Sequence, residues 1–157
     1  MTSTPDAAPT HATTPADLTA TDMLERFATG ELSPVEATEA TLARIADADP
    51  AVNAYCLVDA DRALDQARAA ETRWARGEPR GRLDGVPTSI KDIFLTRDWP
   101  TLRGSRTIDP PQPWPADAPP LARLRPHPAR GGGHPPPPPR RHGHPCGSAR
   151  VLVPHQN

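Results

Sequence analysis

The chain has 157 residues, of which 23 are proline and only 4% are aromatic, which makes it poor material for one compact domain using its whole length. All nineteen acidic residues lie at or before Asp117, so residues 1–125 carry a net charge of about −5 and the four arginines beyond them give about +4. No apolar run is long enough to span a bilayer, and no signal-peptide pattern opens the chain, so we expect a cytoplasmic protein without a membrane partner.

The N-terminal region divides into a leader and a first helix. Residues 1–16 are mainly Thr, Ala and Pro, and they are expected to form a disordered leader. A helix then begins after Thr19 or Thr21, either of which has the side chain of an N-terminal cap. Gly30 stands where a left-handed residue ends such a helix.

The second helix has the clearest start signal of the chain. Ser33-Pro-Val-Glu36 combines a capping serine, a proline at the first helical position and a glutamate placed to return the hydrogen bond. We expect this helix to run to about Ala48, because Pro50 should prevent its continuation. The expected inward-facing residues are Val35, Leu42 and Ile45.

An alternation of strand and helix signals follows. Residues 53–58 form a short apolar run that predicts a strand, and Asp59 then caps a third helix that ends at Gly77. In residues 86–91, β-branched side chains alternate with Pro, Ser and Lys, which predicts a second strand with one buried face. These elements predict an α/β fold, with a mixed sheet surrounded by helices.

The segment after this strand is less regular. Residues 93–95 either extend the strand or begin a loop, and residues 97–100 predict a turn. Taken alone, residues 101–105 also favour a plain turn. Residues 118–125 predict the opening of one more helix, with Pro119 and Pro120 in its first turn.

Lys91 is the only lysine of the chain, which contains seventeen arginines. A guanidinium stays charged at any usable pH, whereas an ammonium gives up its proton when burial and neighbouring charges favour the neutral amine. Lys91 is therefore a candidate general base at the end of a strand. The alternative is an ordinary solvated surface lysine, and spacing alone does not exclude it.

Three segments carry a resemblance to a known family. Leu83-Asp-Gly-Val-Pro-Thr-Ser-Ile-Lys-Asp92, Thr101-Leu-Arg-Gly-Ser105, and Asp117-Ala-Pro with Ala122-Arg-Leu-Arg125 resemble the N-terminal third of amidase-signature enzymes. The resemblance extends from about Thr19 to Arg125. It implies a partial amidase-signature domain over residues 17–125, with Lys91 at the position of the family's catalytic lysine.

The resemblance also implies a catalytic mechanism, and this chain lacks two of the residues that the mechanism needs. These enzymes hydrolyse small carboxylic amides with a nucleophilic serine, a bridging serine and a lysine base, and they need no cofactor or metal. Their two serines lie downstream in a Gly-Ser-rich segment that these 157 residues do not contain. Neither Ser105 nor Ser148 matches those positions, so we expect this chain alone to be inactive.

Residues 126–157 differ in composition from everything before them. They hold nine prolines, five of the six histidines and no acidic residue, so we expect a disordered tail that supplies no core strand. A polyproline-binding partner for Pro135–Pro139 and a metal site in His142-Gly-His144-Pro-Cys146 are alternatives to a solvated run. Residues 126–157 contain no aromatic side chain for base stacking, which argues against specific nucleic-acid binding by the tail. Translation of GC-rich DNA in the wrong frame explains this composition best.

Three functions therefore remain open at the level of sequence. The first is an amidase-family hydrolase of carboxylic amides, truncated before both serines. The second is a noncatalytic fragment whose helices or Pro-rich tail bind a partner. The third, within the family, is a homologue of the amidotransferase A subunit, which releases ammonia from glutamine for tRNA-linked amide synthesis. The residues present select neither the amide nor the oligomeric state.

Overall fold

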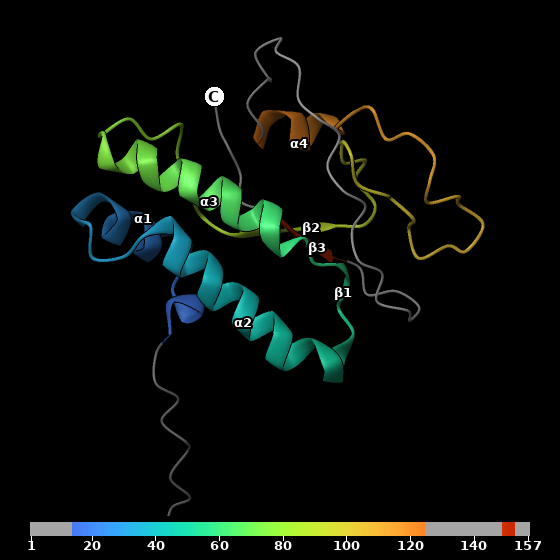
Figure 1. Cartoon of the computed structure of the whole chain (residues 1–157), viewed down its shortest axis with the longest axis horizontal. Helices are drawn as coiled ribbons and strands as arrows, with labels where there is room; N and C mark the ends of the chain where they lie inside the picture. Colours follow the sequence, from blue (N-terminus) through green and yellow to red (C-terminus); the bar gives the residue numbers. More distant parts are fainter. Residues whose placement is uncertain (1–13, 125–148, 153–157) are drawn as a thin grey trace, which may run out of the picture.

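The computed structural model describes residues 14–124 and 149–152, and helices alternate with short strands along the chain. In Figure 1, α2 and α3 lie side by side, the three strands lie at the right-hand end of α3, and α4 lies above them. The elements in chain order are a 3₁₀ turn η1 (Pro15–Asp17), α1 (Ala20–Thr29), α2 (Pro34–Val52), β1 (Tyr55–Leu57), α3 (Ala60–Ala75), β2 (Thr88–Lys91), α4 (Pro119–Leu124) and β3 (Ala149–Leu152). The α/β prediction is confirmed.

The helix starts follow the capping residues in the sequence. Thr19 caps α1 by accepting a hydrogen bond from the Asp22 amide, and Ser33 caps α2 in the same way through Glu36. Asp59 caps α3, as predicted. Gly30 ends α1 with φ of +76°, a conformation that glycine adopts without steric cost.

The leader ends earlier than the sequence suggests. Pro15 and Ala16 were expected to belong to it, but they form η1, with Thr14 as its capping residue. The Asp17 carboxylate accepts hydrogen bonds from the Thr14 amide and hydroxyl, and it pairs with Arg44 of α2 at 2.8 Å. A contact with a residue far along the chain therefore fixes this turn. Residues 1–13 lie outside the described part.

Helix α2 continues past Pro50, so the predicted end at Ala48 is wrong. A proline in the last turn removes a single intrahelical hydrogen bond, and the residues after it compensate for that loss. Asn53 ends the helix in the left-handed region and donates its amide to the Asp49 carbonyl at 2.7 Å. The Asp49 carboxylate accepts from the amides of Ala54 and Tyr55, which directs the chain into β1.

The prediction that the tail supplies no core strand is also wrong. Residues Ala149–Leu152 form β3, the central strand of a sheet in the order β1-β3-β2. This strand runs parallel to β1 and antiparallel to β2. Backbone hydrogen bonds to a strand on each side hold β3 in place, and these bonds depend little on which side chains the strand carries. Pro135–Pro139 and the His142–Cys146 motif lie outside the described residues.

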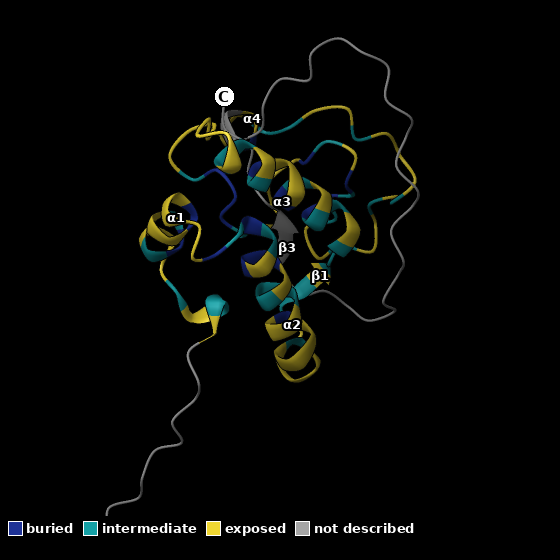
Figure 2. Cartoon of the chain, turned by 60° about the vertical axis from the view of Figure 1, so that its left-hand side comes forward, coloured by how far each residue is buried: buried dark blue, intermediate teal, exposed yellow. Residues whose placement is uncertain are grey.

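Three small apolar clusters make up the core, and Figure 2 shows their buried residues on the inward faces of the helices. The first joins α1 and α2 to the segment before β2, and the second lies between α2 and α3. The third lies under α4, next to β2. Their buried members are, in that order, Met23, Phe27, Leu32, Ala37 and Val86; Ile45, Ala63 and Ala67; and Ile90, Trp99 and Leu121.

In the described ranges, no helix has the length and apolar character needed to cross a bilayer.

Candidate active site

Lys91 is the last residue of β2, and its strand shows the alternation that the sequence predicted. Ile90 is only 5% exposed and packs with Trp99 and Leu121, whereas Ser89 and Lys91 are exposed. Ser89 and Lys91 are two residues apart, so they lie on the same face of the strand. A hydroxyl and an amine therefore stand together on the open face of β2.

The chain enters β2 through a close contact at Gly85. This residue has φ of +87°, and a Cβ atom added to it would lie 2.8 Å from Pro34 Cγ and 3.3 Å from Ala70 Cβ. The left-handed backbone conformation and the lack of room for a side chain both favour glycine here, and any other residue would require the neighbouring atoms to move. Gly85 thus lets the strand entry lie directly against α2 and α3.

Asp84, the residue before this glycine, is fully buried and fixes the same segment. Its carboxylate accepts from Arg73 Nε at 2.8 Å, from Arg73 Nη2, and from the Arg80 amide at 2.8 Å. The Asp84 carbonyl accepts from Trp74 Nε1 at 3.0 Å. The loop that leads to Lys91 is therefore bound to the C-terminal half of α3 by the Arg73 charge pair and the Trp74 indole.

The exit from β2 is a turn, which decides between the two alternatives for residues 93–95. The Phe94 amide donates to the Lys91 carbonyl at 3.2 Å, so the strand stops there. Asp92 is 4% exposed, and its carboxylate accepts from the Leu102 amide at 3.2 Å. Residues 101–105 form the predicted turn, and this hydrogen bond connects it to the end of the Lys91 strand.

Ser89 has a partner that no sequence pattern indicated. The Tyr55 hydroxyl of β1 lies 2.8 Å from Ser89 Oγ. Strands β1 and β2 each pair with β3 and not with one another, so this contact bridges the central strand. Nothing in the local sequence signals a contact between positions 34 residues apart.

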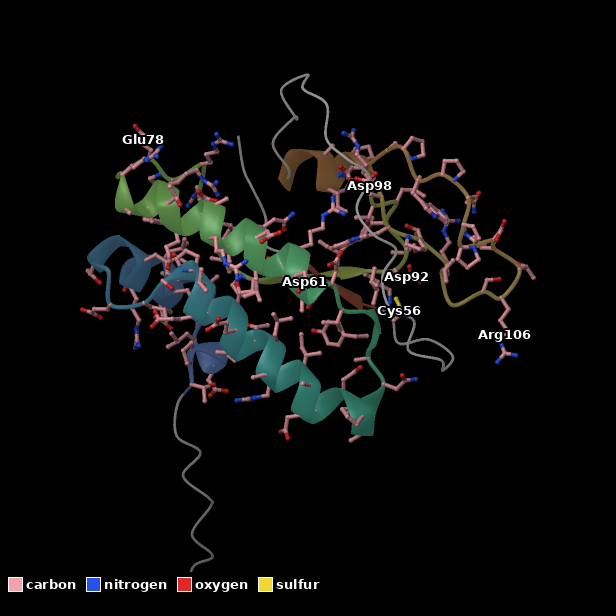
Figure 3. All side chains as sticks on the ribbon, in the orientation of Figure 1. Cys56, Asp61, Glu78, Asp92, Asp98 and Arg106 are labelled. Atoms are coloured by element: carbon pink, nitrogen blue, oxygen red, sulfur yellow. The ribbon has the colours of Figure 1, made fainter. Side chains whose placement is uncertain are left out.

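The Lys91 ammonium is exposed, and within the described part of the chain no hydrogen bond or ion pair reaches it. Figure 3 shows the side chains around the strands and labels Asp92, the residue that follows Lys91 in the sequence. Ser105 bonds to the nearby Thr107 hydroxyl at 2.7 Å within its own loop. Ser148 lies outside the described residues. The described residues thus present an accessible amine, and the hydroxyl on the same face of the strand, that of Ser89, is hydrogen-bonded to Tyr55.

No set of three or more His, Cys, Asp or Glu side chains in the described ranges is arranged to hold a metal ion. Cys56 of β1 is an exposed thiol outside any disulfide.

Comparison with known proteins places most of the chain in one family. The family model described as "Amidase" matches residues 36–134, more than half of the chain. The match starts after Thr19 and continues past Arg125, the limits that the motifs suggested.

Curated relatives have the same family character. The A subunit of glutamyl-tRNA(Gln) amidotransferase from Thermobifida fusca (strain YX) is 46% identical over 108 residues, which are 69% of this chain and 22% of that protein. The subunit of the same description from Anaeromyxobacter sp. (strain K) is 50% identical over 93 residues, which are 59% of this chain and 19% of that protein. The chain thus spans about a fifth of the length of these relatives.

Solved structures agree with this assignment. An inhibitor-bound structure described as "an unexpected vestigial protein complex" that "reveals the evolutionary origins of an s-triazine catabolic enzyme" has a TM-score of 0.60 and 32% identity, over 64% of this chain and 22% of that one. A bacterial aryl acylamidase described as an amidase-signature enzyme has a TM-score of 0.52 and 33% identity, over 58% of this chain and 20% of that one. With this fold and the family match, the chain belongs to the amidase-signature family.

Proposed function

We propose that this chain supplies the lysine of an amide-hydrolysing proton relay, with Lys91 as the general base. In this mechanism the neutral lysine takes a proton from a bridging serine, which takes one from the nucleophilic serine as it attacks the amide carbon. Both serines belong to segments that these 157 residues do not contain. The chain by itself is therefore proposed to be inactive towards carboxylic amides.

The observation that carries this proposal is the support given to the backbone around Lys91. The entry to β2 is fixed by Asp84 and Gly85, and its exit is fixed by Asp92. An ordinary surface lysine needs no such support, whereas a base must be held within a fraction of an ångström of its partner. The exposed amine is then accessible to serines supplied by segments outside these 157 residues.

A chimera tests the proposal. Residues 14–124 would replace the matching N-terminal part of the bacterial aryl acylamidase, and cleavage of a chromogenic aryl acylamide would be followed. The chimera is expected to be active, and Lys91→Arg to reduce kcat by about 10²- to 10⁴-fold, the usual contribution of a general base. Arg106→Lys, on an exposed loop, is the control and should leave kcat unchanged. Full activity of the Lys91→Arg chimera would exclude the role.

A second candidate comes from the curated relatives, which are described as A subunits of glutamyl-tRNA(Gln) amidotransferase. On this alternative, Lys91 serves the release of ammonia from glutamine within a larger assembly. The same replacement made in the Thermobifida fusca protein, assembled with its natural partners, distinguishes the two. If the Thermobifida fusca chimera hydrolyses glutamine and the aryl acylamidase chimera does not cleave simple amides, the amidotransferase role is favoured.

We further propose that the unusual composition of the tail reflects a change of reading frame. The support is compositional, since Pro, Arg, Gly and His dominate residues 126–157. We place the change directly after Arg125, although the family match extends to residue 134. The coding DNA tests this: an alternative frame should encode a small-residue strand followed by a Gly-Lys-Thr turn, and its absence from both other frames would refute the idea.

A further inference from the structure

The loop that follows Lys91 buries polar side chains and exposes apolar ones. Thr96 and Thr101 are buried, with exposures of 0% and 1%, whereas the apolar side chains of residues 93–95 are between 39% and 52% exposed. Burial of a hydroxyl costs free energy unless a hydrogen bond compensates for it, and an exposed apolar side chain contributes little to stability. Such departures from the usual pattern are typical of positions that serve function rather than stability.

Both buried hydroxyls donate to one backbone carbonyl, that of Phe94. Thr96 Oγ1 donates to this carbonyl at 3.1 Å, and Thr101 Oγ1 donates to it at 3.3 Å. A carbonyl oxygen has two lone pairs, so two donors together fix the direction of its peptide group. Thr96 is two residues from Phe94, whereas Thr101 is seven residues away and connects the turn to a second segment.

The peptide group of Phe94 is also bonded to the candidate base. The Phe94 amide donates to the Lys91 carbonyl at 3.2 Å, so the backbone of Phe94 links the threonine hydroxyls to the last residue of β2. The residue after Thr101 acts nearby, because the Leu102 amide donates to the buried Asp92 carboxylate at 3.2 Å. These two neighbours therefore hold the chain after Lys91 at two points.

We propose that Thr101 is a positioning residue for Lys91, and that its hydroxyl acts through the Phe94 peptide group. The inference rests on the proposed function, since it assigns Thr101 to the same amide-hydrolysing relay. A displacement of about 1 Å can cost a reaction about 10²-fold in rate, and the Lys91 side chain leaves the backbone where this turn begins. Loss of the Thr101 hydroxyl removes one of the donors that come from outside the turn, so the Lys91 backbone gains freedom.

Hydrogen exchange in the full chain tests the structural step. Phe27 and Phe94 are the two phenylalanines, so ¹⁵N-labelled phenylalanine gives two amide signals. Thr101→Val keeps the shape without the hydroxyl, and it should speed exchange of the Phe94 amide by about five- to tenfold, the effect of losing one hydrogen bond. Thr101→Ser should restore slow exchange. The Phe27 amide, in α1, distinguishes local loosening from loss of the whole fold.

The matched control is Thr38→Val. Thr38 is also 0% exposed, and its hydroxyl donates to the Pro34 carbonyl at 2.8 Å within α2. This variant loses the same kind of hydrogen bond, so it should lower stability without speeding exchange at Phe94 relative to Phe27. Equal acceleration at Phe94 by Thr38→Val and Thr101→Val, or no acceleration by Thr101→Val, would overturn the proposal.

Kinetics of the aryl acylamidase chimera test the catalytic step. Thr101→Val should lower kcat by about tenfold or more and change KM by less than about twofold, because the base is displaced while substrate binding is kept. Thr101→Ser should recover most of kcat, and Thr38→Val should leave kcat unchanged. If kcat depends on Lys91 but not on the Thr101 hydroxyl, this inference alone is overturned. If the Lys91→Arg chimera is fully active, the proposed function fails and this inference fails with it.

Discussion

The Arg73 guanidinium donates two hydrogen bonds to the Asp84 carboxylate, which has no solvent exposure. Breaking a buried pair on one side leaves the other charge without compensation, so Asp84→Asn is expected to lower the free energy of unfolding by about 3 kcal/mol. Urea denaturation measures this change.

The control for this pair lies on the same helix. Asp65 pairs with Arg68 at 2.9 Å, but both side chains are more than half exposed. Asp65→Asn should therefore change the free energy of unfolding by less than about 0.5 kcal/mol. Equal effects of the two substitutions would show that the Asp84 pair does not hold the entry to β2.

Gly85 provides a test of the close approach between the strand entry and the helices. Gly85→Ala combines a left-handed alanine with a Cβ atom 2.8 Å from Pro34 Cγ, so we expect a loss of about 2–4 kcal/mol. Gly77→Ala is the control, since Gly77 has φ of +69° and open space around it, and it should lose about 1 kcal/mol. Similar urea midpoints for the two variants would argue against the contact with Pro34.

The indole of Trp99 is 2% exposed and donates from Nε1 to the Asp59 carboxylate at 2.9 Å. Trp99→Phe keeps an aromatic ring in the third apolar cluster but leaves this carboxylate oxygen without that donor. We expect a loss of about 1–3 kcal/mol in the free energy of unfolding, with a change in near-UV circular dichroism. Trp114→Phe, on the loop before α4, should cost less because its indole is only half-buried.

The start of α1 should weaken in acid. The Thr19 hydroxyl and then its amide, both donating to the Asp22 carboxylate, hold the pKa of Asp22 below its usual value of 3.8. A lowered folded-state pKa gives stability that is present above the unfolded-state pKa and is lost as the pH falls through the folded-state value. Asp22→Asn should remove this acid dependence from the thermal midpoint, whereas an unchanged pH profile would contradict the capping role.

The solitary lysine predicts a simple pattern of chemical labelling. An amine acylating reagent has two targets in this chain, the N-terminus and Lys91, and Lys91 is exposed. Under native conditions Lys91 should therefore react about as fast as in the denatured chain, which mass spectrometry measures. Protection of Lys91 in the native state would mean that another segment covers β2.

Local signals in the sequence are sufficient for most of the helices. Ser33 and Asp59 cap their helices through neighbours three residues away, and Gly30 ends α1 through its own backbone conformation. Each of these features depends on a few adjacent residues, so pattern and capping rules identify them. The alternation around Lys91 is predictable for the same reason.

Features that depend on distant partners are not predictable in this way. Pro50 predicts the end of a helix, but Asp49 stabilises the next turn by accepting from amides beyond it. Strand β3 escapes prediction because its stability comes from two neighbouring strands and not from its own composition. The partners of Asp84 and Ser89, both central to the candidate site, leave no periodic signal in the chain.

The hydrogen bond between the Tyr55 and Ser89 hydroxyls, which links β1 to β2, provides an intrinsic spectroscopic probe. Tyr55 is the sole tyrosine, and its hydroxyl reaches Ser89 across the intervening strand. A phenol that gains or loses such a bond shifts its ultraviolet absorption, so second-derivative spectra would report the separation of the two outer strands without any label. The width of the sheet next to the lysine can thus be followed in solution while chain concentration, acidity or added segments are varied.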